Sequence, residues 1–199
     1  MSIIEILLLL FSYLLGSIPF GYLLTKKFAS KNILDHGSGN IGSTNVKRIA
    51  GKKISIYTQL LDMAKGLIPV GVTMLIMNYG TLQLSSFVVY LVAFASIIGH
   101  DFSIFLRFKG GKGVNTTVGA SILIAPFPVL ISVLIYYITK WKFKYVSLGS
   151  LLLALSLPIS EIILNGFSRE FYYLIVCTLL IIILHLPNIN RLIKKTETK

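Results

Sequence analysis

The sequence has few acidic residues, a single cysteine and no cluster of metal ligands. Seven aspartates and glutamates stand against 19 lysines and arginines, so the formal net charge is +12. Cys177 lies inside an apolar run and cannot form an intramolecular disulfide, so we interpret it as packing filler. His36, His100 and His185 are far apart and have no other ligand at metal-site spacing. These residues therefore predict no metal site. We also expect no cofactor and no nucleic-acid partner.

Apolar residues are abundant instead. They make up 55% of the 199 residues, and the mean hydropathy is +0.82. A soluble domain of this length could not bury so much apolar surface, whereas a bilayer accepts it. The first stretch follows no basic residue and ends in no small-residue cleavage pattern, so we expect a retained helix and not a signal peptide. The apolar stretches are Ile3–Thr25, Ile54–Met77, Leu84–Gly99, Val114–Thr139, Tyr145–Leu164 and Phe171–Leu186.

The basic residues gather between these stretches, within 26–53, 107–112, 140–144 and 191–199. Six crossings would leave the last two clusters outside the cell. If Val114–Thr139 folds back as a hairpin, all four clusters lie inside and only Arg169 lies outside, which the positive-inside bias favours. The hairpin has a break point at Ala125-Pro126-Phe127-Pro128, because proline removes a helix donor. Each arm would hold about 12 residues, or roughly 18 Å of helix.

We therefore predict an all-α integral membrane protein with about seven transmembrane segments, the N-terminus outside and the C-terminus inside. A short hairpin lies near 114–139. Residues 1–199 form a single polytopic membrane domain, with cytoplasmic motif loops at 26–53, 101–113, 140–146 and 185–199. The pattern indicates no particular oligomeric state.

The first motif loop, from His36 to Arg48, alternates three glycines with serine, asparagine and threonine. Glycines let backbone N–H groups converge as an anion nest, and arginine binds phosphate oxygens in a bidentate way. The alternative is a flexible loop followed by a surface charge pair. The density of small donors before Arg48 favours the anion site.

The second motif loop contains Lys109-Gly110-Gly111-Lys112-Gly113 directly before an apolar segment. A helix N-terminus preceded by glycines and lysines suits a phosphate. The loop is not a Walker A motif, because Leu106 stands where that motif needs glycine. The alternative is an anchor of snorkelling lysines at lipid headgroups, and the loop by itself does not decide between the two.

Polar residues also occur within or at the ends of other apolar stretches. Asp62 and Lys65 are spaced to share one helix face, either as a neutralised structural pair or as a brace or contact for the site. Ser147 begins one span. His185, Asn188 and Arg191 end the last span and begin the tail, on the side of the glycine loops.

Taken in order, these segments resemble the bacterial acyl-phosphate:glycerol-3-phosphate acyltransferases, the PlsY family. The resemblance is carried by Gly16-Ser17-Ile18-Pro19-Phe20-Gly21, Gly37-Ser38-Gly39-Asn40-x-Gly42-x-Thr44-Asn45-x-x-Arg48, Asp62-x-x-Lys65-Gly66, Gly99-His100-x-Phe102, Phe108-Lys109-Gly110-Gly111-Lys112-Gly113-Val114, Ser147-Leu148, and His185-x-x-Asn188-Ile189-x-Arg191-Leu192. The chain departs from the usual family residues at Ser43, Ser103, Asn115, Leu186 and Lys195.

The resemblance implies a seven-segment enzyme of the bacterial cytoplasmic membrane, with its active site facing the cytoplasm. Its reaction transfers a fatty acyl group from acyl phosphate to the 1-hydroxyl of glycerol 3-phosphate, giving lysophosphatidic acid and phosphate. The implied partners are these two substrates and membrane lipids, without a cofactor or metal.

The resemblance also implies the roles of individual residues. The expected catalytic residues are Ser38, Asn40, Arg48, Lys112 and His185. The expected substrate-binding residues are Gly37, Gly39, Gly42, Thr44, Asn45, Lys109, Gly110, Gly111, Ser147 and Asn188. Our hypothesis for the proton is that a substrate phosphate takes it while His185 positions the reactants.

Two alternatives belong to other functional classes. A transporter or channel for a phosphate-bearing solute would also have short broken segments and intramembrane charges. We find no inverted repeat, and the polar motifs concentrate on one face, which disfavours this class. The other alternative is a catalytically idle relative of the acyltransferases.

Overall fold

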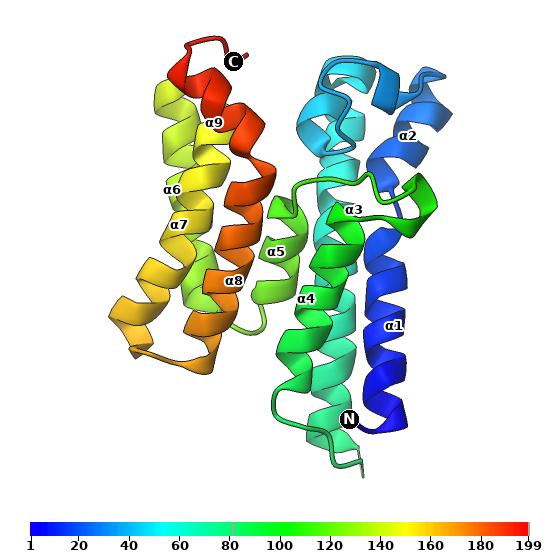
Figure 1. Cartoon of the computed structure of the whole chain (residues 1–199), viewed down its shortest axis with the longest axis vertical. Helices are drawn as coiled ribbons and strands as arrows, with labels where there is room; N and C mark the ends of the chain where they lie inside the picture. Colours follow the sequence, from blue (N-terminus) through cyan, green and yellow to red (C-terminus); the bar gives the residue numbers. More distant parts are fainter. Residues whose placement is uncertain (81, 199) are drawn as a thin grey trace. The chain divides into compact units, whose positions relative to one another are not determined.

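The computed structural model describes residues 1–80 and 82–198 of the chain. These residues form α-helices and two short 3-10 helices, and no strand occurs among them, as predicted (Figure 1). The elements are α1 (Ile3–Ser17), α2 (Phe20–Ala29), η1 (Ile33–Asp35), α3 (Ser43–Tyr79), α4 (Val88–Asp101), η2 (Ile104–Leu106), α5 (Val114–Ser121), α6 (Pro126–Phe143), α7 (Val146–Asn165), α8 (Arg169–Leu184) and α9 (Leu186–Ile193).

Four stretches of the described chain are helical, long and apolar enough to cross a membrane: Ile3–Ala29, Ser43–Tyr79, Val88–Leu106 and Val146–Asn165. A fifth joins α8 and α9 if their 60° bend belongs to one span. The prediction of an α-helical membrane protein is thus supported by the helices themselves. The count of seven segments and the orientation stay predictions.

Two predicted helix boundaries need correction. The stretch Ile3–Thr25 is not one helix, because the chain leaves helical geometry at Ile18 and restarts after Pro19. A residue before proline is pushed out of the α region, which accounts for the break. The expected hairpin stretch is broken between Ser121 and Pro126, close to the predicted point, but its two helices are unequal, with eight and 18 residues.

The predicted motif loops also contain more helix than expected. Residues 43–50 form the first part of α3, which bends at Gly51, where φ is +87°. Most of the segment 140–146 belongs to the end of α6, and α9 lies within 185–199. Helix α4 continues to Asp101, so His100 lies in the helix. Sequence periodicity missed these pieces because their apolar content is low outside the membrane core.

Contacts between residues divide the chain into two compact units, Met1–Leu123 and Ile124–Lys199. We describe each unit by itself. The prediction of a single membrane domain over residues 1–199 stays a prediction.

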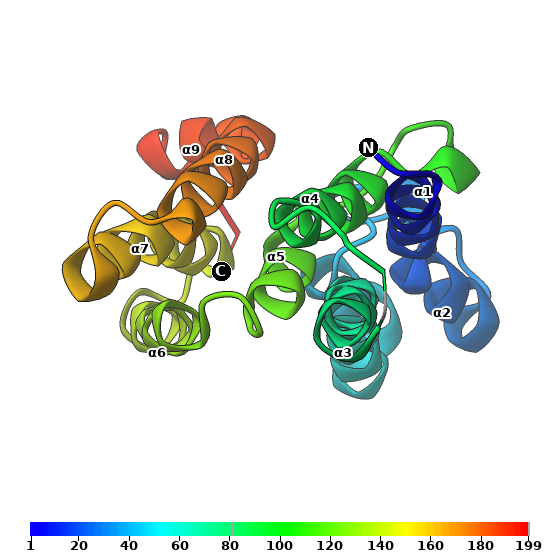
Figure 2. The same cartoon turned by 90° about the horizontal axis from the view of Figure 1, so that it is seen from below.

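In the first unit, α1 packs along α4, and α3 packs along α5 (Figures 1 and 2). Glycines allow the backbones to approach closely. A Cβ on Gly99 would lie 2.3 Å from the carbonyl oxygen of Tyr13, and one on Gly119 would lie 1.9 Å from that of Met63. In lipid, where no hydrophobic force drives helices together, this close packing stabilises their association.

Both motif loops of the first unit lie at the same end of its helices, opposite the N-terminus (Figure 1). The first is anchored by a fully buried cluster of Ile33, Ile41 and Val46. The second is tied down by the Ser103 hydroxyl, which donates to the carbonyl oxygen of Ser17 at 2.5 Å. The predicted grouping of these two loops on one side is consistent with this arrangement.

In the second unit, α7 packs between α6 and α8 (Figure 2). The Thr178 hydroxyl of α8 donates to the carbonyl oxygen of Ala154 in α7 at 2.7 Å, a polar contact buried between apolar helices. The start of α7, the end of α6 and α9 lie at one end of this unit (Figure 1). The residues that connect α7 to α8 lie at the other end.

Substitution of Gly119 by alanine should destabilise the protein. The added Cβ would collide with backbone of α3, and overpacking of this kind costs about 1–3 kcal/mol. Thermal unfolding in detergent, followed by circular dichroism, measures the effect. Gly71→Ala is the matched control, because its Cβ would meet only the Leu123 side chain at 3.6 Å. Equal melting temperatures for the two variants would contradict the packing argument.

Candidate functional site

Two helix N-termini lie close together where the motif loops of the first unit meet. Asn115, in the first turn of α5, donates from Nδ2 to the hydroxyl of Ser43 at the start of α3, at 3.3 Å. Gly42 and Gly113 precede these helices and have no side chain with which to cap them. Uncapped N–H groups and the positive ends of two helix dipoles therefore converge, an arrangement that attracts an anion.

The motif loops also contact each other directly. Asn40 donates from Nδ2 to the carbonyl oxygen of Gly110 at 3.3 Å, and its Oδ1 accepts from the backbone N–H of Gly42 at 2.9 Å. The structure thus joins segments that are 70 residues apart in the sequence. The motifs predicted that the two loops form one site. We call the region formed by Gly37–Thr44 and Lys109–Lys112 the composite region.

Asn45 organises the inside of the first loop. Its side chain is buried, accepts from the backbone N–H of Ser38 at 3.0 Å, and donates to the carbonyl oxygens of His36 and Asn40, each at 3.0 Å. Gly37 and Gly39 adopt φ values of +62° and +68°, which glycine alone reaches at no steric cost. The loop is therefore held in one conformation by a side chain that we expected to bind substrate.

These contacts correct part of the predicted anion nest. The N–H of Ser38 is bonded to Asn45, that of Gly39 to the carbonyl oxygen of His36, and that of Gly42 to Asn40. These three backbone amides are therefore used within the loop. Other possible anion donors are the exposed Ser38 side chain, the half-buried Thr44 side chain and the first turn of α3.

The second loop rests on His100 of α4. The N–H of Gly111 donates to the carbonyl oxygen of His100 at 2.9 Å, and a Cβ on Gly111 would lie 1.9 Å from the His100 Nε2. At Gly110 a Cβ would lie 2.2 Å from the same carbonyl oxygen. Both glycines are thus required because the loop packs closely against His100. The interpretation as a phosphate loop did not include this reason for the glycines.

His100 belongs to a buried charged cluster. Its Nδ1 lies 3.7 Å from Asp62 Oδ1, which pairs with Lys65 Nζ at 3.2 Å. Lys65 also donates to the carbonyl oxygen of Ile18, at the break between α1 and α2, at 2.9 Å. The pair adds a second hydrogen bond to a carbonyl group that also accepts from Phe20 N–H, and it lies beside the helix end on which the second loop rests.

Three predicted cations surround the composite region. Arg48 lies exposed on the first part of α3, Lys112 is half-buried directly before α5, and Lys109 is exposed in the loop. Each carries a positive charge near the converging helix N-termini. The region therefore has a cationic character that comes from side chains and backbone together.

In the second unit, three other predicted residues lie at one end. Ser147 and His185 are buried at the start of α7 and at the bend between α8 and α9, and Asn188 is buried in α9. The His185 Nδ1 lies 2.8 Å from the carbonyl oxygen of Ile181, so Nδ1 is the donor.

Glu197 in the tail joins these residues. Its carboxylate accepts from Asn188 Nδ2 at 2.7 Å and from Arg191 Nε at 2.6 Å. Partial burial raises the pKa of Glu197, but hydrogen bonds from Arg191, Asn188 and Ser147 outweigh it, so the pKa lies below the ordinary value. The carboxylate thereby orients Asn188 and holds the tail against α9.

The structure brings Gly37–Thr44 and Arg48 together with Lys109–Lys112 in one unit, and Ser147 with Asn188 in the other. Their roles in catalysis or binding stay predictions. Sequence reasoning missed His100, Asn115 and Glu197 as site-supporting residues. The signals were present, because His100 follows a motif glycine, Asn115 departs from the family residue and Glu197 is the only acid in a basic tail. No group of three or more metal-ligating side chains occurs among the described residues.

Comparisons with known proteins identify relatives along nearly the whole chain. The family model described as glycerol-3-phosphate acyltransferase matches residues 6–195. A glycerol-3-phosphate acyltransferase from Clostridium acetobutylicum is 44% identical over 98% of this chain and 99% of its own, and one from Syntrophotalea carbinolica is 37% identical over 97% and 96%.

A solved structure agrees with the sequence comparisons. It is a crystal structure of PlsY (YgiH), described as an integral membrane glycerol 3-phosphate acyltransferase in its glycerol 3-phosphate form. It is similar to this chain with a TM-score of 0.88 and 35% identity, over 98% of this chain and 94% of that one.

Replacing Asn45 by alanine should loosen the first motif loop. It removes an acceptor and leaves buried carbonyl oxygens without their donor, at a cost of about 1–3 kcal/mol. Hydrogen exchange of residues 36–42, read by mass spectrometry, should become faster in Asn45→Ala. The control is Asn190→Ala on the exposed side of α9, which should leave this segment unchanged. If hydrogen exchange of residues 36–42 is unchanged in Asn45→Ala, Asn45 does not organise this loop.

Proposed function

Because the chain belongs to the glycerol-3-phosphate acyltransferase family, we propose that it transfers a fatty acyl group from acyl phosphate to the 1-hydroxyl of glycerol 3-phosphate. The products are lysophosphatidic acid and phosphate, and the reaction starts phospholipid synthesis in the membrane. The similar PlsY structures, titled by their glycerol 3-phosphate and lysophosphatidic acid forms, support this acceptor and product.

The observation that carries the proposal is the convergence of the α3 and α5 N-termini beside Arg48 and Lys112. Both proposed substrates are phosphate anions, whereas Arg48, Lys112 and the two helix N-termini are positive. Exposed arginine binds phosphate in a bidentate way, whereas lysine directly before a helix acts as a point charge. Charge neutralisation is the task that such a site performs best.

Acyl phosphate is the donor that this residue set suits. It is a mixed anhydride whose leaving group, phosphate, departs readily once its charge is compensated. The protein then has to align the glycerol hydroxyl with the acyl carbon, neutralise the phosphates and accept one proton. Lys112 and Arg48 supply the neutralisation, and Ser38 and Thr44 supply hydroxyl donors.

The proton leaves the acceptor hydroxyl for a substrate phosphate, and His185 positions the reactants. Its Nδ1 is held by the Ile181 carbonyl group, which orients the ring. Asn188 and Ser147, both oriented toward the Glu197 carboxylate, bind polar groups of the substrate in this proposal.

We place the active site on the cytoplasmic side of a bacterial cytoplasmic membrane, with seven segments, the N-terminus outside and the C-terminus inside. In the first unit, the basic residues of both motif loops lie at one end (Figure 1). In the second unit, the clusters at 140–144 and 191–195 share one end, and Arg169 begins α8 at the other. Each unit by itself therefore follows the positive-inside bias.

Purified protein in detergent, given acyl phosphate and labelled glycerol 3-phosphate, should form labelled lysophosphatidic acid. Arg48→Ala and Lys112→Ala should each lower kcat/KM by about 100-fold or more, because each loses a charge that stabilises the transition state. Lys52→Ala, which removes an exposed charge from the same helix, should stay within about twofold of the unmodified protein. Absence of product with acyl phosphate and other acyl donors would refute the enzyme, and uptake of glycerol 3-phosphate into vesicles would then favour a transporter.

The variant His185→Asn separates positioning from proton transfer. If His185 positions the reactants, kcat should fall by about 10- to 100-fold while the acidic limb of the pH–rate profile keeps its midpoint. The measurement is kcat between pH 5 and 9, with Asn190→Ala as the control on the same helix as Asn188. A lost or shifted limb would instead identify His185 as the general base, and an unchanged rate would remove it from the mechanism.

A further inference from the structure

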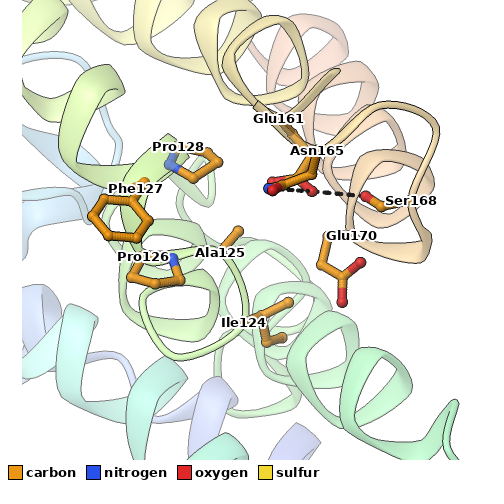
Figure 3. Close-up of a pocket in the computed structure, with 9 residues that line it drawn as sticks. All are labelled: Ile124, Ala125, Pro126, Phe127, Pro128, Glu161, Asn165, Ser168 and Glu170. Atoms are coloured by element: carbon orange, nitrogen blue, oxygen red, sulfur yellow. Dashed lines mark hydrogen bonds between the residues drawn. The ribbon is translucent and has the colours of Figure 1, made fainter. Parts of the chain in front are cut away.

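The second unit contains a pocket at the opposite end of α7 from Ser147. Its volume is about 310 Å³, and it lies where the segment before α6 meets the connection between α7 and α8 (Figure 3). Ser147 and Asn165 are separated by 18 residues of the same helix, which corresponds to about 27 Å. Since α7 is long and apolar enough to cross a membrane, the pocket and the Ser147 end lie near opposite membrane surfaces.

The pocket has two chemically different walls. One is apolar and consists of Ile124 and the segment from Ala125 to Pro128, and the other carries Glu161, Asn165 and Ser168 (Figure 3). Glu170 completes the lining (Figure 3). Acid beside apolar surface suits a molecule with a cationic head and an apolar body.

Glu161 is the decisive residue. Its side chain is 2% exposed, and its Oε1 accepts from Ser168 Oγ at 2.7 Å and from Asn165 Nδ2 at 3.1 Å. Among the residues that the structure describes, none donates a hydrogen bond to its Oε2. A buried carboxylate oxygen left without a donor costs free energy, so a native structure ordinarily supplies one from a bound group.

The structural role of Glu161 does not use this second oxygen. Through Oε1 it holds Ser168, whose hydroxyl caps α8 by accepting from the N–H of Phe171 at 3.0 Å. Glutamine would make the same contact. A second carboxylate on the pocket wall, Glu170, adds negative charge to a chain whose formal net charge is +12.

The chemistry that fits is a primary ammonium group. It donates up to three hydrogen bonds and carries the charge that two carboxylates attract, whereas the two carboxylates are too few to replace the ligands of a divalent metal ion. Large apolar side chains beside the pocket are exposed, among them Phe127 at 69% and Phe167 at 73%, so the surroundings are lipid-facing. Amphiphiles with an ammonium head place that head near the membrane surface, which is where this pocket lies.

We propose that this pocket binds the primary ammonium head of an amphiphile, with Oε2 of Glu161 as its principal acceptor and Glu170 as a second. The apolar wall contacts the carbon atoms that adjoin the ammonium group. The lining of the pocket contains none of the proposed acyl-transfer residues, and its ligand does not depend on the proposed reaction.

Native mass spectrometry of the detergent-purified protein tests the site. The probes are phosphatidylethanolamine, phosphatidylcholine and phosphatidylglycerol with identical acyl chains. We expect phosphatidylethanolamine to be retained at least tenfold better than the other two, because a trimethylammonium head cannot donate to Oε2 and a glycerol head carries no positive charge. Free ethanolamine forms a separate arm, and binding in that arm alone would identify a soluble amine as the source of the ammonium group.

Glu161→Gln should reduce retention of the preferred probe at least tenfold, and Glu170→Gln should reduce it less. The matched control is Glu5→Gln, a buried carboxylate of the first unit whose two oxygens accept from Ser85 N and Ser2 N at 2.7 and 2.8 Å. Thermal unfolding verifies that each variant is folded, and Glu170→Gln carries the test alone if Glu161→Gln is not. Equal retention by the unmodified and variant proteins, or retention that follows Mg²⁺ and not the amine, would overturn the proposal.

Discussion

The ion pair between Asp62 and Lys65 supports both the membrane helices and the site of the first unit. Lys65 donates to the carbonyl oxygen of Ile18 where Pro19 breaks the first span, and this oxygen also accepts from the N–H of Phe20. Asp62 pairs with Lys65 and faces the imidazole of His100. A broken helix is tolerated in a bilayer only if the freed backbone groups are satisfied by protein. The same pair therefore ties the break to α3 and lies against the end of the helix on which the second glycine loop rests.

That arrangement changes how the glycines of the motif loops are understood. Gly110 and Gly111 lie against His100 so closely that any side chain would collide, and Gly37 and Gly39 take left-handed backbone conformations. Within the first loop, the side chain of Asn45 accepts a hydrogen bond from the backbone N–H of Ser38. The glycines act mainly by letting two loops pack tightly at the starts of α3 and α5, and the cationic region follows from that packing.

Much of the fold could be predicted from the sequence. Apolar content and length indicated a helical membrane protein, and the prolines at 126 and 128 indicated the break between α5 and α6. The helix from Ser43 to Ala50 was mistaken for loop, because it precedes the membrane core and has a glycine at its bend. The hydrogen bond between Asn115 and Ser43 could not be predicted, since 72 residues separate them and no local pattern reports such a contact.

The sequence by itself determined the class of protein, the sign of its charge and the types of residue available for binding phosphate. These properties follow from composition and from short motifs, which act through solvation and local backbone geometry. Tertiary structure alone decided that Asn45 serves its own loop, that Glu197 holds Asn188 and Arg191, and that one oxygen of Glu161 faces a pocket. Such assignments depend on which distant groups come within about 3 Å, and hydrogen bonds weaken steeply beyond that range.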